Sequence, residues 1–463
     1  MPENPLAPDW LREPGDANAL ADGVWSQNAL RDASGELVIA GVPASRLAAE
    51  FGTPVYVLDE DDARGRARAT KAAFDAAMQG IGTSAKVYYA GKAFLSTEVV
   101  RWVAEAGLGI DVASEGELAV ALAGGIEPSR IGVHGNNKSE RQIVRAVEAG
   151  VGAIVIDSAI EVERVAAAAA KAGKRQRVRL RINSGVHAST HEYLATAHED
   201  QKFGVTVADA PRIVQAIRGL PGLEFIGLHS HIGSQIFEVH GFEEAARRLL
   251  ALHAELLRDG PVPELNLGGG FGIAYTSADD PMPVERIAAG MAAALAAAAA
   301  ELGIEVPVIA VEPGRSIIGR AGTTLYTVGT VKPVAVDTAQ GVAVRKYVSV
   351  DGGMSDNIRT SLYHAAYSAR IASRVSEDRP ALARVAGMHC ESGDIVVRDE
   401  YLPMDVGPGD LLAVPATGAY GWAMASNYNW VPRPPVVAVR DGQARLIVRG
   451  ETIDDLLARD AGI

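Results

Sequence analysis

A lysine at the end of a short apolar run is the residue of this sequence best suited to covalent chemistry. Residues 86–93 read Lys-Val-Tyr-Tyr-Ala-Gly-Lys-Ala, so 87–90 predicts a buried strand, and Gly91 a sharp turn before Lys92. A lysine held over an apolar pocket loses its proton more readily and can attack a carbonyl to form a Schiff base. Lys86, at the other end of the strand, is expected to be a solvated charge. Taken alone, the pattern is more typical of a surface lysine.

Three more polar motifs follow apolar runs in the same way. They are His-Ser-His-Ile-Gly-Ser-Gln at 229–235, Gly-Gly-Gly-Phe-Gly at 268–272 and Glu-Pro-Gly-Arg at 312–315. The glycine run suits close approach of backbone N–H groups to a phosphate. Glu312 suits a general base, a metal ligand or a partner for a protonated ring nitrogen. A reactive lysine, such an acid and a phosphate cradle together specify pyridoxal phosphate, because the lysine binds the aldehyde and the acid keeps the pyridine nitrogen protonated.

A metal site is the main alternative for the histidines. His229 and His231 are two residues apart, so they share one face of an extended segment and could bind one ion. A metal-dependent hydrolase barrel would need further ligands at other strand ends. Asp111 and Asp157 are available, but each is easily explained as a turn or capping residue. This alternative leaves Lys92 without a role, so no metal is expected.

The elements that must position these motifs alternate along the chain. Apolar runs predict eight strands, at 87–90, 108–112, 130–134, 153–157, 178–182, 225–229, 264–267 and 308–312. Helical patterns lie between them, at 96–106, 114–123, 139–149, 159–172, 209–218, 242–258 and 284–302, and an earlier helix is expected at 59–78. Eight alternating units fit an α/β fold with a TIM-type (β/α)8 barrel better than a doubly wound sheet. The chemistry of such a barrel lies at the carboxyl ends of its strands, where all four motifs fall.

A mainly β domain is expected after the barrel. Strands are predicted at 324–331, 342–350, 395–397, 411–414, 436–440 and 444–448, with Gly, Pro and Asp between them. Two early strands, at 37–40 and 55–58, are expected to join that domain, which makes the barrel an insertion. The sequence therefore predicts an N-terminal arm with strands at 1–58, the barrel at 59–317 and the C-terminal β domain at 318–463.

Composition narrows the class of partner. The chain has 463 residues, 48% of them hydrophobic and 22% charged, and its net charge of −13 disfavours nucleic acid and anionic membranes. Its N-terminus lacks the basic and apolar regions of a signal peptide, and its longest apolar run is too short for a membrane span. The only cysteine, Cys390, excludes an internal disulfide. A cytoplasmic protein is expected.

The motifs resemble one known family. Tyr-Ala-Gly-Lys-Ala at 89–93, His-Ile-Gly-Ser-Gln at 231–235, the two motifs at 268–272 and 312–315, and His-Cys-Glu-Ser-Gly-Asp at 389–394 look like those of the fold-type III pyridoxal-phosphate decarboxylases. The resemblance runs from about residue 38 to residue 457 with the motifs in the family's order. It is strongest to the members that decarboxylate meso-2,6-diaminopimelate to L-lysine, the last step of bacterial lysine synthesis.

The resemblance implies a role for each matching residue. Lys92 would carry the cofactor, His231 would stack on its ring and Glu312 would pair with its ring nitrogen. The implied cofactor-binding residues are Lys92, His231, Ser234, Gly268, Gly269, Gly270, Glu312, Gly314, Arg315 and Tyr420. The implied substrate-binding residues are Arg315, Arg359, Tyr363, Glu391 and Tyr420, and the implied catalytic residues are Lys92 and Cys390.

The distal end of the substrate separates the members of this family. Arg359 and Tyr363 are four residues apart, so on a helix they share one face and could bind a distal carboxylate, while Glu391 takes the distal ammonium. An arginine there would repel a diamine end, which disfavours the ornithine and arginine decarboxylases of the same fold. A non-enzymatic pyridoxal-phosphate carrier would share Lys92 but has no use for Cys390. Without the resemblance, a solvated helix face would explain Arg359 and Tyr363 equally well.

The resemblance also implies a homodimer with shared active sites. Cys390 and Glu391 of the partner subunit would reach into each site, with the thiol over the cofactor face opposite Lys92. Cys390 is then the favoured donor of the proton that returns to the substrate after decarboxylation, and Lys92 is the other possible donor. One departure from the family follows Tyr420, where Gly421 and Trp422 stand in place of other residues.

Overall fold

The computed structural model describes residues 4–186 and 202–462. The chain forms two compact units, which we call the barrel unit (Arg64–Gly272 and Pro281–Ile317) and the sheet unit (Met1–Ala63, Ile273–Asp280 and Ile318–Ile463). The domain limits expected at residues 58 and 317 stay predictions. The units differ from them chiefly at Ile273–Asp280, which groups with the sheet unit because Ile273 and Tyr275 are buried in a hydrophobic cluster there.

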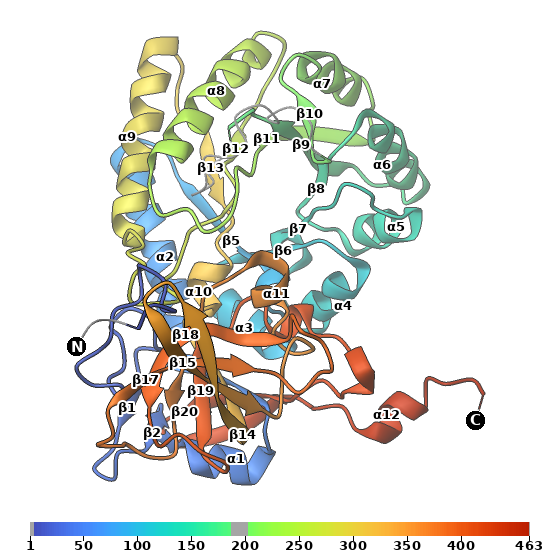
Figure 1. Ribbon diagram of the computed structural model, residues 1–463. Helices are drawn as coiled ribbons and strands as arrows, with labels where there is room; N and C mark the ends of the chain where they lie inside the picture. The colour runs from blue at the N-terminus through green and yellow to red at the C-terminus, as the bar shows by residue number, and fades with distance from the viewer. Residues whose placement is uncertain (1–3, 187–201, 463) are drawn as a thin grey trace. The chain divides into compact units, whose positions relative to one another are not determined.

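The barrel unit contains a closed ring of eight parallel strands, which confirms the predicted fold (Figure 1). The strands are β5 (Ala85–Ala90), β6 (Gly109–Val112), β7 (Ile131–Val133), β8 (Ala153–Ile156), β9 (Gln176–Asn183), β11 (Leu223–His229), β12 (Glu264–Asn266) and β13 (Val308–Val311). They pair in chain order, and β13 pairs with β5 to close the ring. The short strand β10 (Val205–Thr206) pairs with the end of β9. All eight carboxyl ends therefore lie at one rim.

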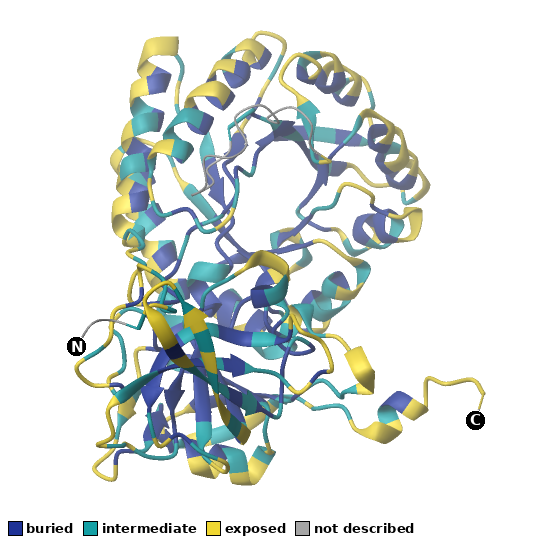
Figure 2. Ribbon diagram, in the orientation of Figure 1, coloured by how far each residue is buried: buried dark blue, intermediate teal, exposed yellow. Residues whose placement is uncertain are grey.

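Helices alternate with these strands. They are α2 (Glu60–Gly80), α3 (Thr97–Glu105), α4 (Glu115–Ala123), α5 (Glu140–Ala149), α6 (Ala159–Lys171), α7 (Ala210–Arg218), α8 (His240–Leu257) and α9 (Val284–Leu302). Three of them begin at a serine, Ser96, Ser114 or Ser139, whose hydroxyl accepts a backbone N–H of the first turn. In Figure 2 the barrel strands are buried while the helices α5 to α9 expose one face, as expected for amphipathic helices packed on a barrel.

The amino-terminal end of the barrel interior holds an ion-pair network. Glu264 is buried and accepts hydrogen bonds from Lys86 and from Arg179, which lies 2.7 Å away through Nη2. Arg179 also stacks on the Tyr88 ring, 5.3 Å from its centroid. Lys86 was expected to be a solvated charge; its side chain is 39% exposed but also pairs with Glu264, because a buried carboxylate needs cationic partners.

The sheet unit is mainly β, as predicted. Its large sheet contains β4 (Val55–Asp59), β14 (Gly322–Thr338), β15 (Gly341–Val350), β16 (Arg370–Ile371), β17 (Pro380–Ala386), β18 (Ile395–Pro403), β19 (Leu411–Pro415), β20 (Val436–Arg440) and β21 (Gln443–Val448). The N-terminal strand β4 lies between β14 and β20, which confirms that an early strand joins the C-terminal part. The strand β17 was not predicted, because its arginine and alanines give little β signal.

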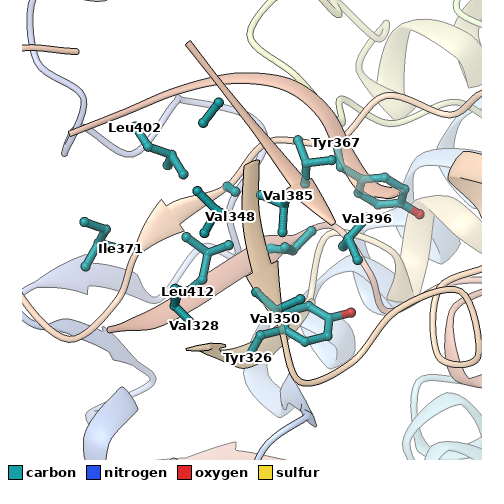
Figure 3. Close-up of a cluster of buried hydrophobic side chains, with 14 of the residues drawn as sticks. Tyr326, Val328, Val348, Val350, Tyr367, Ile371, Val385, Val396, Leu402 and Leu412 are labelled. Atoms are coloured by element: carbon teal, nitrogen blue, oxygen red, sulfur yellow. The ribbon is translucent and has the colours of Figure 1, made fainter. Parts of the chain in front are cut away.

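A buried cluster stabilises this sheet (Figure 3). Tyr326, Val348, Val385 and Leu412 come from four different strands and pack together in it. A second cluster joins β4 to a small sheet made of β1 (Ala29–Arg31), β2 (Leu37–Ile39) and β3 (Val42–Pro43). The second cluster contains residues from both ends of the chain, such as Val57 and Val437, so this part of the sheet unit forms only when those ends meet.

The remaining elements are short. They are the helices α1 (Ala44–Phe51), α10 (Arg315–Ile318), α11 (Arg359–Tyr363) and α12 (Ile453–Leu457), and the 3-10 turns η1 (Gly91–Ala93), η2 (Pro128–Arg130), η3 (Trp422–Met424) and η4 (Tyr428–Trp430). Within residues 4–186 and 202–462, no helix combines the length and apolar character that crossing a bilayer requires.

Candidate active site

Lys92 lies in η1, directly after the buried end of β5. A Cβ at Gly91 would lie 2.9 Å from the Asp111 carbonyl oxygen, so only glycine lets the chain pass so close to β6. The Tyr89 hydroxyl donates to the Phe94 carbonyl at 2.6 Å and pins the turn. These contacts direct Lys92 into a cavity of about 530 Å³ at the carboxyl rim of the barrel.

The cavity collects ionisable groups from separate strand ends. Its polar lining includes Lys92, Asp111, Glu117, His134, Arg181, His229, His231 and Glu312. Desolvation by the surrounding protein lowers the pKa of Lys92. The Glu312 carboxylate opposes this effect and Arg181 adds to it. A lowered pKa increases the fraction of neutral amine, which is the nucleophilic form.

Glu312 is the best-supported carboxylate of this cavity. Its side chain accepts hydrogen bonds from Asn266 Nδ2 at 2.6 Å and from His229 Nε2 at 3.2 Å. Burial tends to raise the pKa of Glu312, but His229 and His134 outweigh burial and hold the pKa well below its ordinary value. Burial lowers the pKa of His229 to about 4, so this imidazole donates to Glu312 as a neutral ring. Glu312 is therefore ionised at neutral pH.

Asp111 differs from Glu312 although the two share the cavity. Burial raises the pKa of Asp111 well above its ordinary value, and the Glu312 charge raises it further. This shift favours the protonated form of Asp111, because a second negative charge beside Glu312 is unfavourable in a buried site. The interpretation of Asp111 as a turn or capping residue is wrong: it lies in β6, and Gly132 leaves the space that its Oδ1 occupies.

His134 is a cavity residue that sequence reasoning missed. Its Nε2 lies 3.1 Å from Asp111 Oδ1 and 3.5 Å from Glu312 Oε1, and its ring meets the His229 ring edge to face at 5.0 Å. The signal was present, because His134 ends the third predicted strand. Arg181 and Asn266 were also missed, although each lies near the end of a predicted strand.

The glycine turn after β12 forms a tight cradle. A Cβ at Gly269 would lie 2.0 Å from the Glu312 carbonyl oxygen, and one at Gly270 would lie 2.3 Å from the Gly233 carbonyl oxygen. Gly268 and Gly270 also have φ values of +70° and +109°. The Gly269 N–H donates to His231 Nδ1 at 3.2 Å. No other residue type fits this turn.

The loops around that turn bring together the remaining barrel residues of the prediction. Arg315 Nη2 donates to Ser234 Oγ at 2.9 Å, and a Cβ at Gly314 would touch Ala90 at 3.0 Å. An anion in this corner would meet a guanidinium, a hydroxyl and backbone N–H groups, which is the chemistry of a phosphate site.

The histidines could also bind a metal ion. Ligand atoms of His134, His229 and Glu312 lie within 4.8 Å of one another. The expected pair of His229 and His231 does not form this group, because His231 Nδ1 accepts a hydrogen bond from the glycine turn. A metal site here would leave Lys92 and the glycine cradle unexplained.

Five predicted residues belong to the sheet unit. Arg359 is 6% exposed, lies 4.8 Å from the Tyr275 ring centroid and donates to the Tyr367 hydroxyl. Tyr363, at the other end of α11, is 60% exposed, so the two side chains differ in burial. The helix α11 has five residues and ends at His364 in the left-handed conformation.

The other three lie in loops of the same unit. Cys390 and Glu391 are exposed, and Cys390 is a free thiol. Tyr420 has a φ of +60°, a strained value typical of functional residues. At the edge left open by the family comparison, a Cβ at Gly421 would lie 2.8 Å from the Thr417 carbonyl oxygen, and the Trp422 indole donates to Pro434 O at 3.1 Å.

Comparison with known proteins agrees with this geometry. Residues 65–319 match the family model described as pyridoxal-dependent decarboxylase, pyridoxal binding domain. The diaminopimelate decarboxylase of Mycobacterium tuberculosis H37Rv is 52% identical over 447 residues, covering 95% of this chain and 98% of that protein. That of Bacillus subtilis is 44% identical over 431 residues, covering 92% and 95%. The crystal structure of the M. jannaschii diaminopimelate decarboxylase in complex with L-lysine matches with a TM-score of 0.84 and 32% identity, covering 94% and 98%.

Proposed function

We infer the chemistry of the site from one premise: the chain belongs to the diaminopimelate decarboxylases, a family of pyridoxal-phosphate-dependent enzymes. It decarboxylates meso-2,6-diaminopimelate to L-lysine and carbon dioxide, the final step of bacterial lysine biosynthesis. The roles of individual residues are our proposal. The observation that carries them is the barrel cavity in which Lys92, Glu312 and His231 meet, with the glycine turn hydrogen-bonded to His231.

The cavity residues fit pyridoxal phosphate. Lys92 supplies the amine that attaches the aldehyde, and its lowered pKa favours the nucleophilic form. The phosphate would be held by the glycine cradle together with two side chains, namely Gly268, Gly269, Gly270, Ser234 and Arg315. The absence of space for a Cβ in the cradle supports this role. When bound, the cofactor supplies an electron sink for the charge left by the departing carboxylate.

Glu312 and Asp111 then divide the work of two acids. Glu312 stays ionised because His229 and Asn266 donate to it, so it can hold a proton on the ring nitrogen. The raised pKa of Asp111 favours its protonated form, which adds no second negative charge. His231 would stack on the ring, and its burial lowers the pKa well below the ordinary value, which keeps the imidazole neutral.

We propose that the sheet unit supplies the specificity. Arg359 would bind the distal carboxylate of the substrate with help from Tyr363, and Glu391 the distal ammonium. Tyr420 and Arg315 would contact both cofactor and substrate. The charged, preorganised guanidinium of Arg359 supports this role, because its stacking on Tyr275 and Tyr367 fixes the plane of the fork. Such an arginine disfavours diamine-forming substrates.

We also propose the assembly and the location. A homodimer would share its sites, with Cys390 of the partner subunit returning the proton to the former α-carbon. The exposed position of Cys390 and Glu391 supports a role outside their own chain. The expected domains are 1–58, 59–317 and 318–463. A cytoplasmic location suits a chain whose single cysteine forms no internal disulfide.

The attachment point gives the decisive test. Borohydride reduction of the holoenzyme followed by peptide mass mapping should place the cofactor on Lys92, and Lys92→Ala should abolish both this label and the turnover. Lys86→Ala is the matched control, because Lys86 lies at the far end of the same strand. A label on another lysine, or full turnover by Lys92→Ala, would overturn the proposal.

A further inference from the structure

Three loops of the sheet unit meet at His389. We call them the Ser355 loop (351–358), the Cys390 loop (387–394) and the Tyr420 loop (416–430). The His389 ring is 8% exposed, with Nε2 at 2.8 Å from Ser355 Oγ and Nδ1 at 3.0 Å from Asn429 Oδ1. An amide oxygen can only accept, so Nδ1 carries a hydrogen and donates to Asn429, while Nε2 shares a hydrogen bond with the Ser355 hydroxyl. One imidazole therefore links all three loops.

The backbone of the Cys390 loop is also bound to the Ser355 loop, through Asp394. Asp394 accepts the His389 N–H at 2.7 Å through Oδ2 and the Met354 N–H at 2.6 Å through Oδ1. The carboxylate also fills the space where a Cβ would stand at Gly353 or Gly387, at 2.6 and 2.2 Å. The Asp394 carboxylate therefore joins the Cys390 loop to the Ser355 loop by two hydrogen bonds and by close contact with two glycines.

The third loop is tied in independently. Ser426 N–H donates to the Ser355 carbonyl at 2.8 Å, and the Tyr428 ring packs on His389 with centroids 5.2 Å apart. In contrast to His389, the two residues that follow it, Cys390 and Glu391, are exposed. A rigid base under two exposed reactive side chains is the arrangement that preorganisation requires.

We propose that His389 is a positioning residue, which holds Cys390 and Glu391 at a set distance from the segments that carry Arg359 and Tyr420. It takes no part in the chemistry and acts through these neighbours. The inference rests on the roles proposed above for Cys390 and Glu391. Its consequence is that loss of His389 disturbs substrate recognition and proton return but leaves the barrel cavity and its cofactor unchanged.

The single cysteine allows a direct test in the holoenzyme. Iodoacetamide labels one thiol, so the alkylation rate of Cys390 reports the state of its loop without any substrate. In His389→Leu we expect an altered alkylation rate, a fall of about 100-fold in kcat/KM for meso-diaminopimelate and an unchanged cofactor dissociation constant. His389→Gln, which can both donate and accept, should recover most of the loss. His240→Leu, at an exposed histidine of α8, is the control.

The outcomes separate this inference from the proposed function. An unchanged alkylation rate in His389→Leu, or a parallel loss of cofactor binding, overturns the positioning role. Should His389→Leu fail to fold, Asn429→Ala removes one of the two hydrogen bonds and must change the same rates in the same direction, or the inference falls. If Cys390→Ala and Glu391→Gln keep full kcat/KM, the proposed roles of those residues fail. A changed alkylation rate in His389→Leu would still show that His389 positions the Cys390 loop.

Discussion

At the scale of single residues, the neighbouring groups shift the pKa values of the two buried acids of the cavity in opposite directions. Glu312 has hydrogen-bond donors on both oxygens, which favour the carboxylate, whereas burial and the Glu312 charge raise the pKa of Asp111 and favour its protonated form. Burial also lowers the pKa of His134 to about 4, so the imidazole between them is neutral. Glu312 thus supplies a fixed negative charge in the cavity, which its proposed pairing with a protonated pyridine nitrogen requires.

Arg359 gives the first residue-scale prediction. Arg359→Ala should lower kcat/KM for meso-diaminopimelate by the loss of a charge-assisted bidentate contact, about 2–4 kcal/mol of transition-state binding. The kcat/KM of Arg359→Lys should fall between those of wild type and Arg359→Ala, because lysine keeps the charge but not the planar guanidinium. Steady-state kinetics measure this, and the cofactor spectrum should be unchanged. An unaltered kcat/KM for Arg359→Ala would remove this residue from the substrate site.

Cys390 gives the second. Replacing the thiol by alanine should slow lysine formation by roughly two to four orders of magnitude, the usual contribution of a positioned proton donor. The measurement is lysine release in a quenched time course, with Ser392→Ala, on the exposed part of the same loop, as the control. Near wild-type rates in Cys390→Ala would assign the proton to Lys92 instead.

At the scale of elements, both units use glycine where two backbones pass closer than a side chain allows. The cradle after β12 and the contact of Gly418 with the Ile318 carbonyl, 2.0 Å from where a Cβ would stand, are two instances. The segment before α11 is held by hydrogen bonds to a buried acid. Asp356 is 1% exposed, accepts the Gly353 N–H at 2.7 Å through Oδ2 and accepts the Tyr326 hydroxyl.

That acid predicts a pH dependence of stability. Burial raises the pKa of Asp356 to about 7, whereas the unfolded chain ionises near 3.8. Between these values the unfolded state binds fewer protons, so this residue lowers the free energy of unfolding as pH rises, and the effect saturates above pH 7. Asp356→Asn removes the titration, so its unfolding free energy relative to wild type should rise by about 2–3 kcal/mol from pH 5 to pH 8.

Denaturant unfolding at the two pH values measures this difference. Asp351→Asn, a half-buried acid in the same segment, is the matched control. An equal gap between the Asp356→Asn variant and wild type at both pH values would show that Asp356 is ionised in the folded protein.

At the scale of the whole molecule, the proposed sharing of sites has a direct consequence. Inactive Lys92→Ala chains mixed with inactive Cys390→Ala chains should regain activity, because each mixed dimer contains one site with both wild-type groups. Random exchange should restore about a quarter of the wild-type activity, since half of the dimers are mixed and each has one intact site of two. No recovery after verified subunit exchange would mean that each site is built within one chain.

Much of the fold could be predicted from the sequence because it depends on local patterns. The eight barrel strands, the helices between them and the strand ends that carry Lys92, His231 and Glu312 follow from short apolar runs and glycine turns. Pairing of β4 with the C-terminal strands was predictable only from the order of the runs, and β17 escaped because its residues favour no element.

What the tertiary structure decided is which of these strand ends touch and which groups are ionised. His134, Asp111 and Asn266 enter the site of Glu312 from strands far apart in sequence, and no local pattern marks such contacts. The pairing of Lys86 with Glu264 and the difference in burial between Arg359 and Tyr363 likewise depend on the folded surroundings. Burial and charge pairing are properties of the folded surroundings, so they set pKa values and side-chain positions that a linear sequence cannot specify.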